Sequence, residues 1–147
     1  MTIMRTNLRR NERGAALIEA AVTIPVILLI AVGIFEFGRA YQTWQVLTNA
    51  AREGARMAVI TGTTDTDIST RVRNYMKAGS LPNYSTATVT IVRGVALTGA
   101  DTASEIKIDY PFQFMVLNPV VRLVAPSDTK TGAPITMRSS ALMRNES

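Results

Sequence analysis

One apolar stretch near the amino terminus limits what this chain can fold into. Residues 15–35 are almost entirely apolar and carry one charge, that of Glu19. Because a helix rises about 1.5 Å per residue, such a stretch spans roughly 30 Å, the thickness of the hydrocarbon core of a bilayer. Four arginines precede it and favour a cytoplasmic amino terminus by the positive-inside rule. We therefore predict a membrane-inserted chain whose carboxyl-terminal part lies outside the cytoplasm.

Three kinds of segment have an apolar stretch of this kind. A cleavable secretory signal needs a shorter apolar core followed by a small-residue cleavage site, and residues 35–41 offer none. A plain signal anchor explains the length and the arginines. It gives no reason for a carboxylate at Glu19, which costs about 2.5–3.5 kcal/mol at mid-membrane and less near the interface. The third kind is a leader that is cut at Gly14, where the basic residues end.

The residues around Gly14 support this third kind through a family resemblance. An apolar residue follows Gly14, Glu19 is the fifth residue after it, and Pro25 comes six residues later. This pattern resembles the type IV prepilin processing site. Together with the later sequence Ala-Ala-Arg-Glu-Gly-Ala-Arg at 50–56, it resembles TadE-like proteins of the tight-adherence (Flp) pilus system. The resemblance extends over roughly residues 9–60.

The resemblance implies a non-catalytic pseudopilin or minor pilin that takes part in pilus assembly. Its partners would be other pilins, the assembly machinery, the membrane through one span, and a prepilin peptidase that cuts between Gly14 and Ala15 in the cytoplasmic (inner) membrane. It also implies that Glu19 pairs with the new terminal amine of an adjacent subunit. The alternative is a single-pass, membrane-anchored extracytoplasmic binding module that does not join a filament.

Composition excludes several other functions. The chain has no histidine and no cysteine, which removes cysteine nucleophiles, histidine acid–base catalysis and the usual zinc ligand sets. We expect no catalytic residues, cofactor, metal or small-molecule substrate. The net charge of +5 is concentrated in the leader, where four arginines against Glu12 contribute +3, so nucleic acid is not an expected partner. An enzyme with carboxylates alone, at Asp101, Glu105 and Asp109, is a weaker alternative.

We expect an α+β fold with one long amino-terminal helix. Residues 1–14 are the leader, 15–37 the transmembrane helix, 38–60 its extracytoplasmic continuation and 61–147 a small domain. The helix should run from about Ala16 to about Val59, because apolar residues recur at three- and four-residue spacing beyond the membrane.

Two features of the helix beyond the membrane are candidates for assembly contacts, and a third residue is not. Ala50, Gly54 and Ala58 are small residues at four-residue spacing, which lets another helix approach closely, or else packs the helix on the protein's own domain. Arg52 and Arg56 are expected to form a solvated or intersubunit charge face. Glu36 should lie outside the bilayer and be dispensable.

The small domain should contain one short helix and about three antiparallel strands. The sequence Thr-Asp-Thr-Asp at 64–67 is typical of a helix start, and we favour capping over a calcium loop because the glycine and glutamate of such a loop are missing. The helix should end at Gly79. Strands are expected at about 86–91, 105–114 and 134–144, with a glycine-containing loop at 94–102.

Two details of the domain carry further expectations. Pro111 cannot donate a ladder hydrogen bond, so its part of the second strand should lie at an edge or a bulge. Residues 115–126 are too apolar for an ordinary loop. They are either a short helix that starts at Asn118-Pro119 and covers the sheet, or an exposed apolar lip for a partner or the membrane surface.

Overall fold

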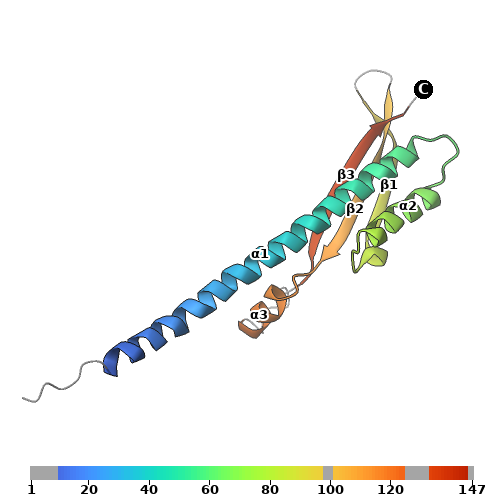
Figure 1. The fold of residues 1–147 in the computed structure, drawn as a ribbon. Helices are drawn as coiled ribbons and strands as arrows, with labels where there is room; N and C mark the ends of the chain where they lie inside the picture. Colours follow the sequence, from blue (N-terminus) through green and yellow to red (C-terminus); the bar gives the residue numbers. More distant parts are fainter. Residues whose placement is uncertain (1–9, 98–100, 125–132, 146–147) are drawn as a thin grey trace, which may run out of the picture. The chain divides into compact units, whose positions relative to one another are not determined.

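The computed structural model describes residues 10–97, 101–124 and 133–145. The chain divides into two compact units, residues 1–35 and Glu36–Ser147. Three helices, one short 3₁₀ helix and three strands are described (Figure 1): α1 Arg10–Ala58, α2 Asp65–Ala78, η1 Tyr84–Thr86, β1 Thr88–Ala96, β2 Thr102–Phe112, α3 Leu117–Val124 and β3 Ile135–Arg144.

The first unit contains the apolar part of helix α1. Most of its large side chains are exposed, for example Leu17 at 71% and Phe35 at 55% of their maximal surface. Pro25 lies inside the helix, and the helix starts at Arg10, earlier than expected. Among the described residues, α1 is the one helix that is long and apolar enough to cross a membrane.

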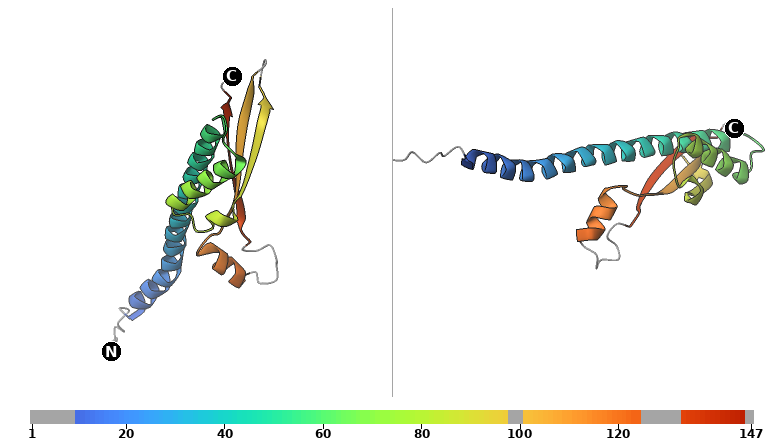
Figure 2. Two further views of the ribbon diagram at one scale, coloured as in Figure 1. Left: turned by 90° about the vertical axis from the view of Figure 1, so that its right-hand side faces the viewer. Right: turned by 60° about the horizontal axis from the view of Figure 1, so that its bottom comes forward.

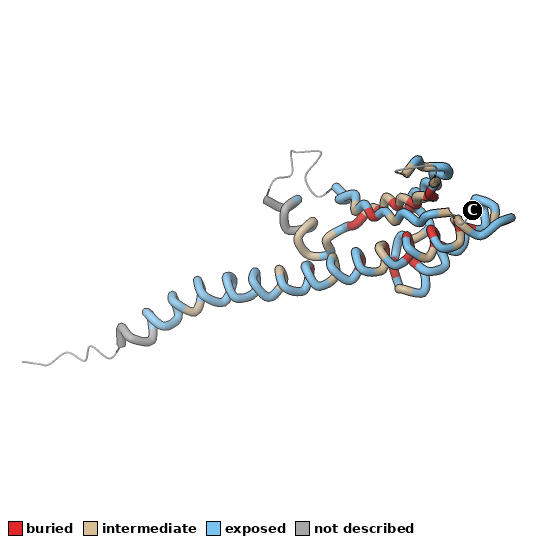
Figure 3. Tube along the Cα trace, turned by 90° about the horizontal axis from the view of Figure 1, so that it is seen from above, coloured by how far each residue is buried: buried red, intermediate tan, exposed pale blue. Residues whose placement is uncertain are grey.

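The second unit is a three-stranded antiparallel sheet with helices on one face. The strands follow each other in the order β1-β2-β3, and α2 and the end of α1 cover the sheet on the same side (Figure 2). The buried residues, drawn red in Figure 3, lie where these two helices meet the sheet. The α+β fold with a long helix, a short helix and three antiparallel strands is therefore confirmed.

The alternation in β2 explains how the sheet faces the helices. Ile106, Ile108, Tyr110 and Phe112 are all buried, as their spacing predicts for a half-buried strand. The β1 ladder ends at the pair Thr88–Asp109, whereas Pro111 pairs with Thr136 of β3. Pro111 therefore lies where β2 has no β1 neighbour, so the predicted edge position is confirmed.

Strand β1 extends further than its sequence suggests. It continues to Ala96, so the expected loop at 94–102 is shorter than predicted. Gly94 has φ +71° and lies in a register shift between Val92 and Val95. A strand can pass through such an irregularity because glycine adopts positive φ without a steric penalty. The glycine thus marks a bulge inside the strand and not the end of the strand.

Helices α2 and α3 both form where they are expected. The hydroxyl of Thr64 accepts a hydrogen bond from the N–H of Asp67 at 3.2 Å, and the Asp67 carboxylate accepts one from the N–H of Thr64 at 3.2 Å. This capping box confirms the role assigned to these residues. The Thr64 hydroxyl also donates a hydrogen bond to the Asp67 carboxylate at 2.6 Å, and this bond, together with the one from the Thr64 N–H, lowers the pKa of Asp67. In α3, Pro119 lies in the first turn, where its missing N–H costs no helical hydrogen bond.

Candidate functional site

The expected processing site is in the first unit. Gly14, Ala15 and Glu19 are all exposed on helix α1. A Cβ built on Gly14 would have no neighbouring atom within 4 Å, apart from the local helix. Ala15 and Glu19 are four residues apart, which places them on the same face of a helix. The described surroundings therefore leave both the Gly14–Ala15 bond and the Glu19 carboxylate accessible to other molecules.

The small residues of α1 pack inside the protein's own domain. Ala50 and Ala58 are 0% and 4% exposed. A Cβ on Gly54 would lie 2.6 Å from Cγ2 of Val72 in α2 and 3.4 Å from Cγ2 of Ile106 in β2. Of the two alternatives, the structure shows the intramolecular one. The hypothesis that Ala50, Gly54 and Ala58 face a neighbouring subunit is wrong for this structure, because Ala50 and Ala58 are buried in the domain's own core and α2 and β2 cover Gly54.

The expected charge face of Arg52 and Arg56 is partly taken up by ion pairs within the protein. Arg52 and Arg56 are exposed, but Arg56 binds Glu53 at 3.0 Å and Arg71 of α2 binds the same carboxylate at 2.8 Å. These hydrogen bonds lower the pKa of Glu53 to about 2. Glu53 thereby joins α1 to α2. Of the two predicted arginines, Arg52 is the one for which no internal ion pair is described.

Glu36 is buried in the structure, whereas the sequence alone led us to expect a dispensable residue. Its side chain is completely buried at the start of the second unit. One carboxylate oxygen accepts a hydrogen bond from the N–H of Val116, and the other accepts one from Arg39 at 2.9 Å. Glu36 thus connects α1 to the segment between β2 and α3. The expectation that Glu36 is dispensable does not fit a carboxylate that is buried and doubly bonded.

A sequence signal for Glu36 does exist in the spacing of the buried face of α1. Thr43, seven residues later, is 6% exposed, and Leu47 and Ala50 are fully buried. Extending this spacing back by two helical turns places Glu36 on the same face as the core residues. No such signal identifies the hydrogen-bond partner of the Glu36 carboxylate, because Val116 lies 80 residues away in the sequence.

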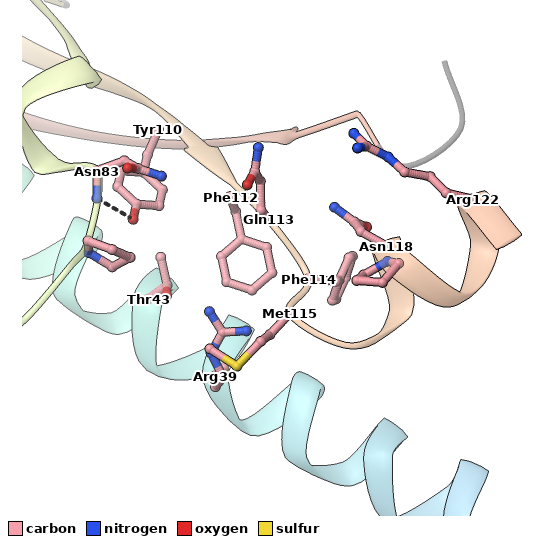
Figure 4. Close-up of a pocket in the computed structure, with 12 residues that line it drawn as sticks. Arg39, Thr43, Asn83, Tyr110, Phe112, Gln113, Phe114, Met115, Asn118 and Arg122 are labelled. Carbon is pink, nitrogen blue, oxygen red and sulfur yellow. Dashed lines mark hydrogen bonds between the residues drawn. The ribbon is translucent and has the colours of Figure 1, made fainter. Parts of the chain in front are cut away.

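A pocket of about 590 Å³ opens beside Glu36 in the second unit. Figure 4 shows its walls, which come from α1, the turn before η1, the end of β2 and the start of α3. The Phe112 ring has two neighbours in this pocket: the Arg39 guanidinium lies 5.5 Å from its centroid, and the Phe114 ring lies 5.2 Å away and perpendicular to it. The lining residues are Arg39, Thr43, Pro82, Asn83, Tyr110, Phe112, Gln113, Phe114, Met115, Asn118, Pro119 and Arg122.

Tyr110 is a buried residue that lines this pocket. Its hydroxyl accepts a hydrogen bond from the N–H of Asn83 at 3.4 Å (Figure 4). Burial raises the pKa of Tyr110, so the phenol is neutral at physiological pH. Aromatic rings, amide side chains and two arginines together suit a ligand with both an apolar and an anionic part.

The three carboxylates of the enzyme alternative each pair with a cation. Asp101 binds Arg144 at 3.0 Å, Glu105 binds Lys107 at 3.1 Å and Asp109 binds Arg138 at 2.7 Å. The pairing with Arg138 lowers the pKa of Asp109. No cluster of three metal-ligating side chains occurs among the described residues. The structure thus gives these carboxylates the surroundings of surface ion pairs.

Within the part of the chain that the structure describes, one helix long and apolar enough to cross a membrane is joined to a small α+β domain, an arrangement typical of membrane-anchored proteins. A family model described as TadE-like protein matches residues 14–56, which confirms the resemblance to TadE-like proteins over this segment. The match begins at Gly14, covers under a third of the chain and ends before the last residue of α1. Searches of curated proteins and of solved structures gave no match.

Proposed function

We propose that this protein is a non-catalytic pseudopilin or minor pilin that takes part in assembly of a tight-adherence (Flp) pilus. The single observation that carries the proposal is the match to TadE-like proteins, which begins at Gly14 and includes Glu19 and the whole apolar stretch. The amino terminus is in the cytoplasm, α1 crosses the inner membrane, and the small domain is outside. Its partners are a prepilin peptidase, other pilins and the assembly machinery.

Cleavage after Gly14 would change the charges at the end of the helix. It removes the arginines of the leader and creates an ammonium group on Ala15. This cation and the Glu19 carboxylate then lie one turn apart at the edge of the bilayer. A carboxylate in lipid is costly when unpaired. Pairing of Glu19 with the terminal amine of an adjacent subunit neutralises both charges and fixes the axial stagger between the two helices.

The test compares Glu19→Ala with wild-type protein in membranes that contain the peptidase and the partner pilins. Mass spectrometry should find Ala15 as the first residue of both proteins. Partner pilins should co-purify with the wild type from detergent extracts and be lost from Glu19→Ala. Asp101→Ala is the matched control, because it removes a partly exposed carboxylate of the domain whose surface ion pair contributes little stability.

Two outcomes would contradict this proposal. A wild-type protein that retains its leader while the peptidase is active would exclude the pilin function. Normal co-purification of cleaved Glu19→Ala protein would exclude the role of the carboxylate.

The pocket favours a second candidate function. A domain with a hollow of this size suits a membrane-anchored binding module that does not join a filament. The two candidates differ in processing: the module keeps its leader and remains anchored, whereas the pilin is cut at Gly14.

A further inference from the structure

The pocket beside Glu36 has a lining of one charge sign. Its two charged residues are Arg39 and Arg122, and no aspartate or glutamate is among its lining residues. The volume of about 590 Å³ falls within the range of about 300–1,000 Å³ that is usual for small-ligand sites. Glu36 lies outside this lining and pairs with one nitrogen of Arg39, and the other N–H donors of that guanidinium suit an anionic ligand.

Arg39 is held in place at one side of this pocket. The Glu36 carboxylate binds one nitrogen of its guanidinium, and the Phe112 ring lies against the group, which leaves the side chain 25% exposed. A guanidinium has five N–H donors in a planar fork, which suits the oxygens of a phosphate. Figure 4 shows Arg39 on the α1 side of the pocket and Arg122 across it on α3.

The apolar lining residues and the position of Arg39 in the sequence indicate which kind of anion binds. Phe114 and Met115 also line the pocket, and Met115 is 62% exposed. Arg39 follows the last residue of the apolar stretch, Phe35, by four residues in the sequence. A phosphate group next to apolar chains at the edge of a bilayer is a phospholipid headgroup. Cationic residues near anionic lipid surfaces are each attracted to them.

We propose that this pocket binds the headgroup of an anionic phospholipid in the outer leaflet of the cytoplasmic membrane. Arg39 and Arg122 contact the phosphate, while Phe114 and Met115 contact the apolar part of the same lipid. Phe114 and Met115, at the start of the apolar segment, then have a role at the membrane surface. The inference rests on the proposed membrane insertion of α1, but it does not depend on cleavage at Gly14 or on pilus assembly.

The experiment is native mass spectrometry of the full-length protein, purified in detergent and titrated with lipids. Phosphatidylglycerol is compared with phosphatidylcholine of the same acyl chains, and inorganic phosphate is added in a separate arm. The wild type should retain phosphatidylglycerol preferentially. The double variant Arg39→Gln with Arg122→Gln should lose this preference by on the order of tenfold.

The matched control is Arg52→Gln with Arg73→Gln. Both arginines are exposed, neither lines the pocket, and the loss of charge is the same. Circular dichroism checks that each variant is folded. Because a loss of fold would also remove binding, Arg39→Lys with Arg122→Lys is added, and this variant should recover most of the preference.

Three results would overturn the proposal. Equal retention of both lipids by the wild type would show that the pocket does not select an anionic headgroup. If the Arg52→Gln, Arg73→Gln variant lost the preference for phosphatidylglycerol to the same extent, the preference would come from the overall charge of the protein. Displacement of the lipid by inorganic phosphate at comparable concentration would identify a site for free phosphate. The mature amino terminus is measured in the same spectra, so failure here is distinguishable from failure of the pilin function.

Discussion

Replacing Gly54 by alanine tests how α1 packs on its own domain. The added Cβ would lie 2.6 Å from Cγ2 of Val72, closer than two carbon atoms can approach, and 3.4 Å from Cγ2 of Ile106. The Val72 side chain is fully buried and belongs to a packed core. The collision therefore cannot be relieved by a side chain moving into solvent, and α1 and α2 have to separate slightly.

The magnitude follows from two opposing effects. Overpacking a core by one carbon costs typically about 1–3 kcal/mol. Alanine in place of glycine inside a helix gains about 1 kcal/mol of helix propensity. The free energy of unfolding should thus fall by about 0–2 kcal/mol for Gly54→Ala. Gly54→Leu adds three further carbons at the same place and should cost clearly more.

Gly38→Ala in the same helix is the matched control. A Cβ on Gly38 would have no neighbour within 4 Å, apart from the local helix. Only the propensity gain of about 1 kcal/mol then remains, so the variant should be slightly more stable than the wild type. The assay is denaturant unfolding of the full-length protein in detergent, followed by fluorescence of Trp44, the single tryptophan.

A second substitution decides whether Val72 causes the effect. Val72→Ala removes two methyl groups and should cost about 1.6 kcal/mol from lost burial alone, with a further cost for the cavity. In the Val72→Ala background, Gly54→Ala should be neutral or stabilising, because the space is now open. Additive effects of the two substitutions would refute the packing argument. A Gly54→Leu protein that keeps wild-type stability but no longer binds its partner pilins would also refute the packing argument, because an intersubunit helix face would give that result.

Two further predictions concern the buried and the bridging carboxylates. Glu36→Ala should cost about 3–5 kcal/mol at most, since it leaves a partly buried arginine unpaired, and hydrogen exchange of the Val116 amide should accelerate more than that of other amides. The pKa of Glu53 is lowered from 4.5 to about 2. The ionised carboxylate therefore stabilises the fold fully above pH 4.5, and this stabilisation is lost as the pH falls towards 2. Arg71→Gln should reduce this acid sensitivity, whereas Arg73→Gln should leave it unchanged, as denaturant unfolding at several pH values would show.

Each of these two predictions has its own contrary result. Val116 exchange that is unaffected by Glu36→Ala would mean that the buried carboxylate does not hold the segment before α3. An equal acid sensitivity in wild type and Arg71→Gln would mean that the ion pair between α1 and α2 contributes nothing to the fold.

Several local features of this protein are readable from its sequence, because each depends on neighbouring residues only. The apolar stretch 15–35 predicts the exposed apolar part of α1 from its length and composition. Thr64 and Asp67 form their capping box within four residues. The alternation from Ile106 to Phe112 predicts which side of β2 is buried, since the side-chain period of a strand is two.

The sequence also indicates a functional candidate at Gly14 and Glu19, and the family match covers both residues. Their pattern is contained in a few consecutive positions, so it can be recognised without knowledge of the fold. Their exposure in the structure is compatible with this candidate.

Tertiary structure alone decided what covers the helix and where the pocket lies. Spacing shows that Ala50, Gly54 and Ala58 share one face, but it does not reveal whether α2 or a second chain lies against that face. Likewise, Glu36 meets an amide 80 residues away, and the pocket is lined from four separate parts of the chain. Such contacts arise only when distant segments pack together, and periodicity within one segment carries no information about the surface that it meets.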